Sequence, residues 1–256
     1  MPGFGRRFAP DDRDRAYLMR RQLKAAQSIV LPVRKTWRIA SGSLDQGDTG
    51  TCVGFAWRNF LRCAPLRTER TGPSAFVIYR EAILRDPWPD NDVERELPDW
   101  DPGLQSGTTV RAGAKALIGF GGLHSILWAF DLQPALEWLL TKGPVVIGVN
   151  WYSSFMRPDH EGIIKITPTA RVDGGHAILV RGADTRRGLA RLSNSWGDEW
   201  GISGECLLPL RDLERLIHED GEVATAVQQR LAPKLFEPPP QFAFVVPSSP
   251  PDTMVA

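Results

Sequence analysis

Residues 45–56 read DQGDTGTCVGFA, and from Cys52 the chain continues as an apolar run that ends near Leu61. The small polar residues at 49–51, Thr-Gly-Thr, are typical of the start of a helix. The pattern therefore predicts a helix over 52–61 with the cysteine in its first turn. A thiolate at such a position gains from the positive end of the helix macrodipole.

Two later motifs supply chemical partners for a thiol. His176 lies in GGHAILV at 174–180, and Asn194 lies in SNSWGDEWG at 193–201. A cysteine becomes a good nucleophile when an imidazole takes its proton, and an amide oxygen can fix the orientation and tautomer of that imidazole. We therefore expect the pKa of Cys52 to be lowered by His176. The two glycines before the histidine indicate a strand that is entered from a tight bend.

Gln46 stands six residues before Cys52. Its side-chain amide and the backbone N–H of Cys52 are both candidates to donate to the oxyanion of a tetrahedral intermediate. Trp196 and Trp200 are expected to shield the histidine–asparagine pair from water, although both would also be buried as ordinary core residues. A nucleophile, a base, an orienting amide and an oxyanion donor together indicate acyl transfer through a cysteine.

These segments resemble the papain family of cysteine peptidases. His176 and Asn194 follow Cys52 by 124 and 142 residues, close to the roughly 130 to 150 typical of that family. The motifs stand in family order and extend over about residues 40–210. The resemblance implies that Cys52 is the nucleophile, His176 the general base, Asn194 its orienting residue and Gln46 the oxyanion donor, with Trp196 over the asparagine.

The resemblance also points to substrate-binding residues. Gly107, followed by Thr108, resembles the glycine whose exposed backbone pairs with an extended peptide substrate. Gly175, next to the base, would leave the adjoining subsite open, or it would serve only to allow the turn. The preferred substrate side chain cannot be derived from these residues.

The chain departs from the secreted members of the family around the nucleophile. Where they have Cys-Gly-Ser-Cys-Trp, residues 49–53 read Thr-Gly-Thr-Cys-Val. With Cys52, Cys63 and Cys206 as its three cysteines, the chain has too few for a disulfide framework. Cys63 and Cys206 are expected to be inert and buried. These features, and the absence of a signal-peptide pattern near the N-terminus, lead us to expect a cytoplasmic protein.

Composition and charge narrow the set of partners. The formal net charge is +1, which gives no reason to expect nucleic acid, and no apolar run is long enough for a membrane span. No residue pair has the spacing of metal ligands, so we expect no cofactor and no metal. A peptide or protein substrate is expected, and the oligomeric state is left open.

The order of predicted elements indicates an α+β fold. Helices are predicted over 52–61, 74–84, 108–117 and 132–140, and strands over 145–151, 163–166, 176–181, 190–193, 205–208 and 222–228. A helical half followed by a strand-rich half agrees with the two-lobed papain-like fold that the resemblance implies, with a helical N-terminal lobe, a barrel-like antiparallel β lobe and a cleft between them. We expect an N-terminal extension over 1–37, a peptidase domain over 38–230 and a proline-rich, disordered tail over 231–256.

Three classes of function remain compatible with these residues. The first is a thiol peptidase that hydrolyses peptide bonds. The second uses the same residues for deamidation, transamidation or the processing of one dedicated protein partner. The third is a non-catalytic binding module, which is the least favoured because none of the reactive residues has been lost.

Overall fold

The computed structural model describes residues 3–24, 31–68, 72–86, 88, 106–121 and 123–228. The predicted tail at 231–256 lies outside the described residues. The elements are η1 (Asp12–Ala16), α1 (Met19–Lys24), β1 (Arg34–Thr36), α2 (Cys52–Arg62), α3 (Ala75–Ile83), α5 (Val110–Gly119), β2 (Leu123–Ala129), α6 (Leu132–Thr141), β3 (Val145–Tyr152), η3 (Ser153–Phe155), β4 (Val172–Asp184), β5 (Leu189–Ser193), β6 (Glu205–Pro209), α7 (Leu210–His218) and β7 (Glu222–Gln228). No helix in the described part of the chain is long and apolar enough to cross a bilayer.

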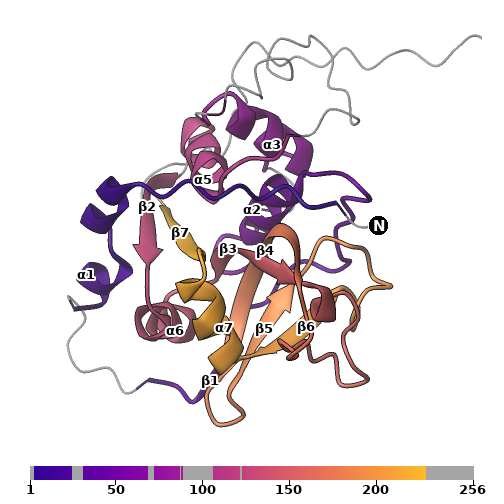
Figure 1. Cartoon of the computed structure of the whole chain (residues 1–256). Coiled ribbons are helices and arrows are strands. Elements are labelled where there is room, and N and C mark those ends of the chain that lie inside the picture. The colour runs from indigo at the N-terminus through magenta and orange to yellow at the C-terminus, as the bar shows by residue number, and fades with distance from the viewer. Residues whose placement is uncertain are drawn as a thin grey trace, which may run out of the picture.

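Helices α2, α3 and α5 pack together as one lobe (Figure 1). Side-chain caps begin two of them: the Ser74 hydroxyl accepts from the N–H of Val77 at 3.2 Å, and the Thr109 hydroxyl accepts from that of Ala112 at 3.0 Å. Gly54 of α2 lies against the backbone of α3, where a Cβ would meet the Ala75 carbonyl oxygen at 2.2 Å. Close packing of α2 thus depends on the missing side chain.

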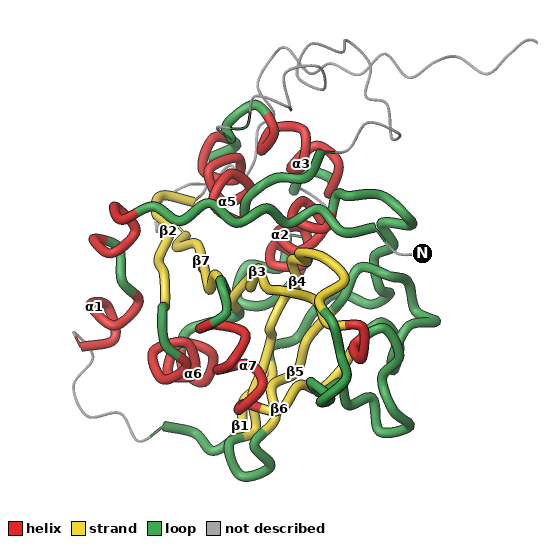
Figure 2. The backbone as a smooth tube through the Cα atoms, in the orientation of Figure 1, coloured by secondary structure: helices red, strands yellow, loops and turns green. Residues whose placement is uncertain are grey.

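The second lobe is an antiparallel sheet with the strand order β2-β7-β3-β4-β5-β6, and β1 pairs with β4 (Figure 2). Helices α6 and α7 pack on this lobe. The mixed helical and antiparallel architecture confirms the predicted α+β, two-lobed fold.

The sheet separates two apolar cores. Along β3, Val146 packs with the helical lobe around Trp57, whereas its neighbour Ile147 packs into the sheet lobe around Trp151. Successive side chains of a strand point to opposite faces, so buried residues alternate between the cores. The strand β4 shows the same alternation at Leu179 and Val180. Because β4 contributes to both cores, its backbone is held firmly on each face.

The beginning of the chain runs between the two lobes. Figure 1 shows the indigo segment running from the N-terminus past α2 and α5 toward β2 and α1. Beyond it, the Tyr17 carbonyl accepts from the N–H of Trp128 in β2 at 2.8 Å. Arg111 of α5 forms ion pairs with Asp11, at 3.1 Å, and with Asp14. Residues of the predicted extension therefore contact both lobes.

Most predicted elements are present, and several segments differ from the prediction. The strand predicted over 163–166 is wrong, since Ile163 makes a single bridge to Leu207. The strand β2 and the helix α7 were not predicted, although Leu213, Leu216 and Ile217 of α7 are buried at helical spacing. The bend predicted before His176 is also wrong, because β4 already begins at Val172.

Candidate active site

Cys52 is the first residue of α2 and is fully buried. Its N-cap, Thr51, makes no side-chain capping bond. The backbone N–H groups of Ala177, Gly5 and Val53 lie near enough to the thiol sulfur to favour its charged form and lower its pKa. One of these residues, Ala177, directly follows His176 on β4, so the thiol lies against the strand that carries the predicted base. Cys52 therefore lies where α2 of the helical lobe packs against β4 of the sheet lobe.

His176 is held by Asn194 through one ring nitrogen. Its Nε2 lies 2.8 Å from Asn194 Oδ1, which also accepts the N–H of Ser195 at 2.9 Å. Because that oxygen accepts, Nε2 carries the ring proton and Nδ1 is left as the basic nitrogen. The buried Nδ1 has no hydrogen-bond partner among the described residues. The ring is thus in the tautomer that can take a proton from a thiol.

Aromatic rings surround this pair. The centroids of Trp151 and Trp196 lie 4.7 and 4.8 Å from that of the His176 ring, and Phe4 lies edge-on at 6.1 Å. Trp200 packs against Trp196 at 5.3 Å. These rings exclude water from the imidazole and restrict its rotation. Trp151 was not singled out in the sequence, because a tryptophan in an apolar strand reads as ordinary core.

Gln46 is buried and anchored from three sides. The Ser195 hydroxyl donates to its Oε1 at 2.7 Å, and the Gln46 N–H donates to the Ser195 carbonyl at 2.8 Å. Its Nε2 donates to the carbonyls of Thr49 at 2.6 Å and Gly3 at 3.1 Å. The fixed Oε1 holds the amide nitrogen against the carbonyls of Thr49 and Gly3. Ser195 is therefore a residue that the sequence reasoning missed, and its position directly after Asn194 was the available signal.

Residues 3–7, here called the N-terminal strap, occupy the space between the lobes. On the helical side, Thr108 donates its N–H to the Gly5 carbonyl at 2.8 Å and accepts the N–H of Arg7 at 2.9 Å. This is a parallel bridge between Arg6 and Thr108. Gly107 has a φ of +78°, and a Cβ there would meet the Gly5 oxygen at 2.5 Å. The predicted substrate-binding backbone is thus paired with the protein's own chain.

The strap is also bonded to the sheet side. The N–H of Arg6 donates to the Gly175 carbonyl at 3.0 Å. A Cβ at Gly175 would meet the Arg6 carbonyl oxygen at 2.2 Å, and one at Gly174 would meet the Phe4 ring at 2.8 Å. Both glycines therefore allow close approach of the strap from within a strand, and neither forms the expected turn.

A buried ion pair anchors the strap. Arg6 lies 3.0 Å from Glu222 of β7 and also donates to the Asp220 carbonyl. Both side chains are buried, and burial raises the pKa of Glu222 to about 7 although Arg6 opposes the shift. Removing either partner would leave the other uncompensated in a dry environment, which is strongly destabilising.

Burial dominates the ionisation of the reactive pair. It raises the pKa of Cys52 to about 11, against the lowering effect of the N–H groups that point at the sulfur. It lowers the pKa of His176 to about 4, against the opposing effect of its bond to Asn194. The expected lowering of the Cys52 pKa is therefore wrong for this closed arrangement. With the strap in place, a neutral thiol and a neutral imidazole are the stable forms.

The structure also describes the two other cysteines. Cys63 and Cys206 are buried free thiols, and burial raises the pKa of Cys63 to about 12. Phe4, Gly5 and Arg6, which fill the cleft, were not identified from the sequence. The run Gly3-Phe4-Gly5-Arg6 resembles an ordinary flexible terminus, and its contacts are all distant in sequence.

The chain is similar to papain-like proteins in sequence and in fold. The sequence profile of the papain family of cysteine proteases matches residues 128–209. An uncharacterized peptidase C1-like protein of Acanthamoeba polyphaga mimivirus is 23% identical over 217 residues, 67% of this chain and 65% of that protein. A cathepsin B-like cysteine proteinase of Ostertagia ostertagi is 37% identical over 68 residues, 26% of this chain and 38% of that protein. The chain thus spans less than two thirds of the length of either relative.

Solved structures give the same fold over more of the chain. Xylellain, a cysteine protease from Xylella fastidiosa, superposes with a TM-score of 0.65 at 18% identity, covering 90% of this chain and 97% of xylellain. A digestive procathepsin L proteinase from Tenebrio molitor larval midgut superposes with a TM-score of 0.59 at 18% identity, covering 88% and 78%. The chain is therefore similar in fold to papain-like cysteine proteases, and its residues 128–209, which include His176 and Asn194, match the profile of the papain family.

Proposed function

We propose that this protein is a cysteine peptidase that hydrolyses peptide bonds through Cys52, His176 and Asn194. The observation that carries the proposal is the ring of His176, which is held at Nε2 by Asn194 while the buried Nδ1 has no hydrogen-bond partner among the described residues. A structural histidine in a dry core would normally have both ring nitrogens satisfied. An unsatisfied basic nitrogen is free to take a proton, which is what a general base requires.

The chemistry follows from these positions. His176 Nδ1 takes the thiol proton, and the sulfur of Cys52 attacks the carbonyl carbon of the substrate. The resulting oxyanion is stabilised by Gln46 Nε2 and the backbone N–H of Cys52. His176 then gives its proton to the leaving amine, which leaves a thioester on Cys52. A water molecule, activated by the same imidazole, hydrolyses this thioester and regenerates the thiol.

Substrate access requires the strap to leave the cleft. The strap presents the N–H of Gly5 to the thiol, and an N–H group cannot be attacked by sulfur. The Gly3 carbonyl of the strap accepts a hydrogen bond from the side-chain amide of Gln46. Gly5 and Arg7 of the strap hydrogen-bond to the backbone of Thr108. The strap therefore occupies the space between the lobes without reacting with the thiol. We propose that the peptidase works when residues 3–7 are displaced.

The test is hydrolysis of a diverse peptide library by the parent chain and by a variant with a destabilised strap, Gly5→Ala. Cys52→Ala in each background should abolish cleavage, and Cys63→Ala serves as a matched control that removes a different buried thiol. Cleavage that survives Cys52→Ala would refute the proposal. Release of ammonia from glutamine side chains without chain cleavage would instead assign the same residues to deamidation.

A further inference from the structure

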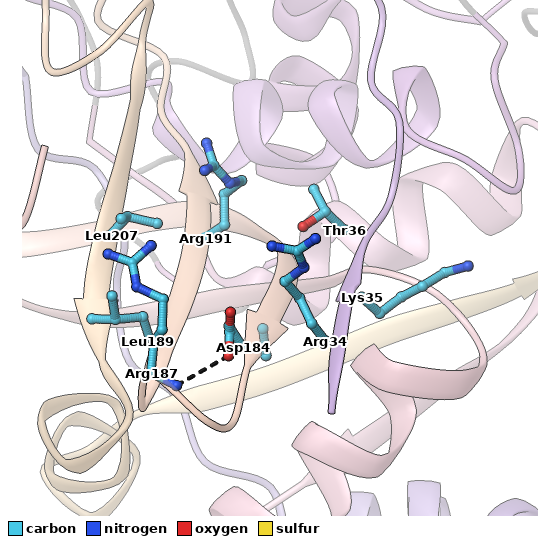
Figure 3. A pocket seen from close by; sticks show the side chains of 9 residues that line it. Arg34, Lys35, Thr36, Asp184, Arg187, Leu189, Arg191 and Leu207 are labelled. Atoms are coloured by element: carbon cyan, nitrogen blue, oxygen red, sulfur yellow. Dashed lines mark hydrogen bonds between the residues drawn. The ribbon is translucent and has the colours of Figure 1, made fainter. Parts of the chain in front are cut away.

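A second cavity lies at the far end of β4 from His176. It has a volume of about 400 Å³ and is lined by residues of β1, the end of β4, the β4–β5 turn, β5 and β6 (Figure 3). His176 and Asp184 are eight residues apart on one strand, which corresponds to roughly 26 Å at about 3.3 Å per residue. The cavity is therefore separate from the candidate active site.

Arginine side chains dominate this cavity. Figure 3 shows the side chains of Arg34, Arg187 and Arg191 extending in the same general direction with their guanidinium groups spaced around the cavity, while the Lys35 side chain points away. The Lys35 ammonium lies over the Trp37 ring instead, 4.5 Å from its centroid. Three different segments thus deliver three guanidinium groups to one space, in a chain whose formal net charge is only +1.

The carboxylates nearby neutralise only part of the charge of these three arginines. Asp184, the one acidic residue of the lining, accepts the backbone N–H of Arg187 at 3.0 Å. Arg191 is paired at 3.0 Å with Glu205, which also binds Arg181. Within the described residues, neither Arg34 nor Arg187 forms a side-chain ion pair. Two planar, permanently charged donors are therefore available to a ligand.

From this arrangement we propose that the cavity binds a small anion that carries two or more linked phosphate groups. A guanidinium presents parallel N–H donors that match phosphate oxygens, and such charge-assisted bonds are stronger than neutral ones. Linked phosphates supply enough acceptors to reach all three arginines. The cavity is large enough for such a ligand, since one water takes up only about 30 Å³.

Binding would have a structural consequence. The strand β1 is three residues long, and its residue Arg34 is directly opposite Asp184 in the register with β4. An anion held by Arg34, Arg187 and Arg191 would join β1 to β5 across the end of β4. It would therefore stabilise the attachment of β1 to the sheet, and this effect is independent of the proposed peptidase activity.

Calorimetric titration of the full chain with sodium tripolyphosphate, pyrophosphate and orthophosphate at constant ionic strength tests the proposal. We expect saturable one-to-one binding of tripolyphosphate, with weaker binding as the number of phosphates falls. Arg34→Gln and Arg187→Gln should each weaken binding by about tenfold, the loss expected for one charge-assisted contact. Hydrogen exchange of residues 34–36 should slow when the ligand is bound.

The matched control is Arg186→Gln, which removes an exposed arginine from the same turn that does not line the cavity. It should change the affinity by less than about twofold. Equal loss in Arg186→Gln and Arg187→Gln would show general attraction to a basic surface and would overturn the proposal, as would the absence of saturable binding. A triglutamate peptide that binds as tightly as tripolyphosphate would assign the cavity to acidic protein segments instead.

Discussion

The surroundings of His176 and of Asp184, both on β4, differ in whether they stabilise charged or neutral side chains. At His176 the strand is covered by aromatic rings and by residues 3–7, and the reactive pair is neutral because burial shifts both pKa values toward the uncharged forms. At Asp184 the same strand borders an open cavity lined by charged arginines. Solvent and counterions stabilise charge at the second end, whereas desolvation suppresses it at the first.

The reactivity of Cys52 and His176 therefore depends on the residues that cover them. The contacts of His176 with Asn194 and of Gln46 with Ser195 belong to the two lobes and do not need the strap. The high pKa of Cys52 does depend on burial, to which Gly5 contributes. Opening the cleft would admit water to the thiol and the imidazole. The reactive pair would then be solvated, as the arginines at the other end of β4 are.

The largest expected effect comes from the base. His176→Ala should lower the turnover of peptide hydrolysis by on the order of 10⁴ or more, whereas Asn194→Ala should be milder because the asparagine only orients the ring. Either change added to Cys52→Ala should cost little more, since groups that act in one step are non-additive. Single-turnover kinetics on variants with parental circular dichroism would measure this. Additive losses would contradict the shared role.

The oxyanion donor should come next. Gln46→Ala should lower turnover by on the order of 10² to 10³, because the amide stabilises a charge that exists only in the intermediate. Ser195→Ala leaves the amide in place but frees its Oε1, so a smaller loss is expected. Alkylation of Cys52 should be little affected by Ser195→Ala. A threefold or smaller loss for Gln46→Ala, with acylation rate-limiting, would mean that another group holds the oxyanion.

Displacing the strap should raise the reactivity of the thiol. A Cβ at Gly5 would meet the Gly50 carbonyl oxygen at 1.6 Å, so Gly5→Ala cannot keep the present backbone position. We expect iodoacetamide to modify Cys52 at least about tenfold faster in this variant at pH 7.5, because the thiol becomes solvated. In the parent, the rate should keep rising toward pH 11.

Pro10→Ala, an exposed position just beyond the strap, is the control for that experiment and should leave the rate of modification unchanged. Peptide mapping by mass spectrometry identifies the modified cysteine. Parental labelling kinetics in a correctly folded Gly5→Ala chain would show that the strap does not limit access to Cys52.

The smallest effect concerns stability and pH. Glu222 has a pKa of about 7 in the folded chain against 4.5 for the free side chain, so the folded state binds this proton more tightly. The resulting stabilisation is fully present below about pH 4.5 and is lost as pH rises to about 7, a change of about 3 kcal/mol. Arg6, Arg111 and Asp14 are the charged groups that act on it.

Glu222→Gln removes this titration. Urea unfolding of the parent and the variant at several pH values should give a difference in unfolding free energy that changes between pH 4.5 and 7 and is constant outside that range. A constant difference throughout would mean that Glu222 does not take up a proton on folding.

Much of the fold was predictable where local pattern and packing agree. The helix α2 has an apolar composition after a cap-like Thr-Gly-Thr, and β3 is strongly apolar, so their positions followed from the sequence. The segment 163–166 was apolar for another reason: Ile164 is buried beneath the sheet lobe without forming a strand. Apolar composition alone cannot distinguish a buried strand from a buried segment without regular structure.

The sequence determined which reactive residue types this protein has and how they are spaced, because nucleophile, imidazole and amides occur in short, ordered motifs. Only the tertiary structure decided that Gly5 lies on Cys52, that Arg6 is buried with Glu222 and that Arg34 joins Arg187 and Arg191. Those contacts link segments far apart in the chain and leave no local periodicity. The pKa of Cys52 depends on them, since it responds to everything that excludes water from the sulfur.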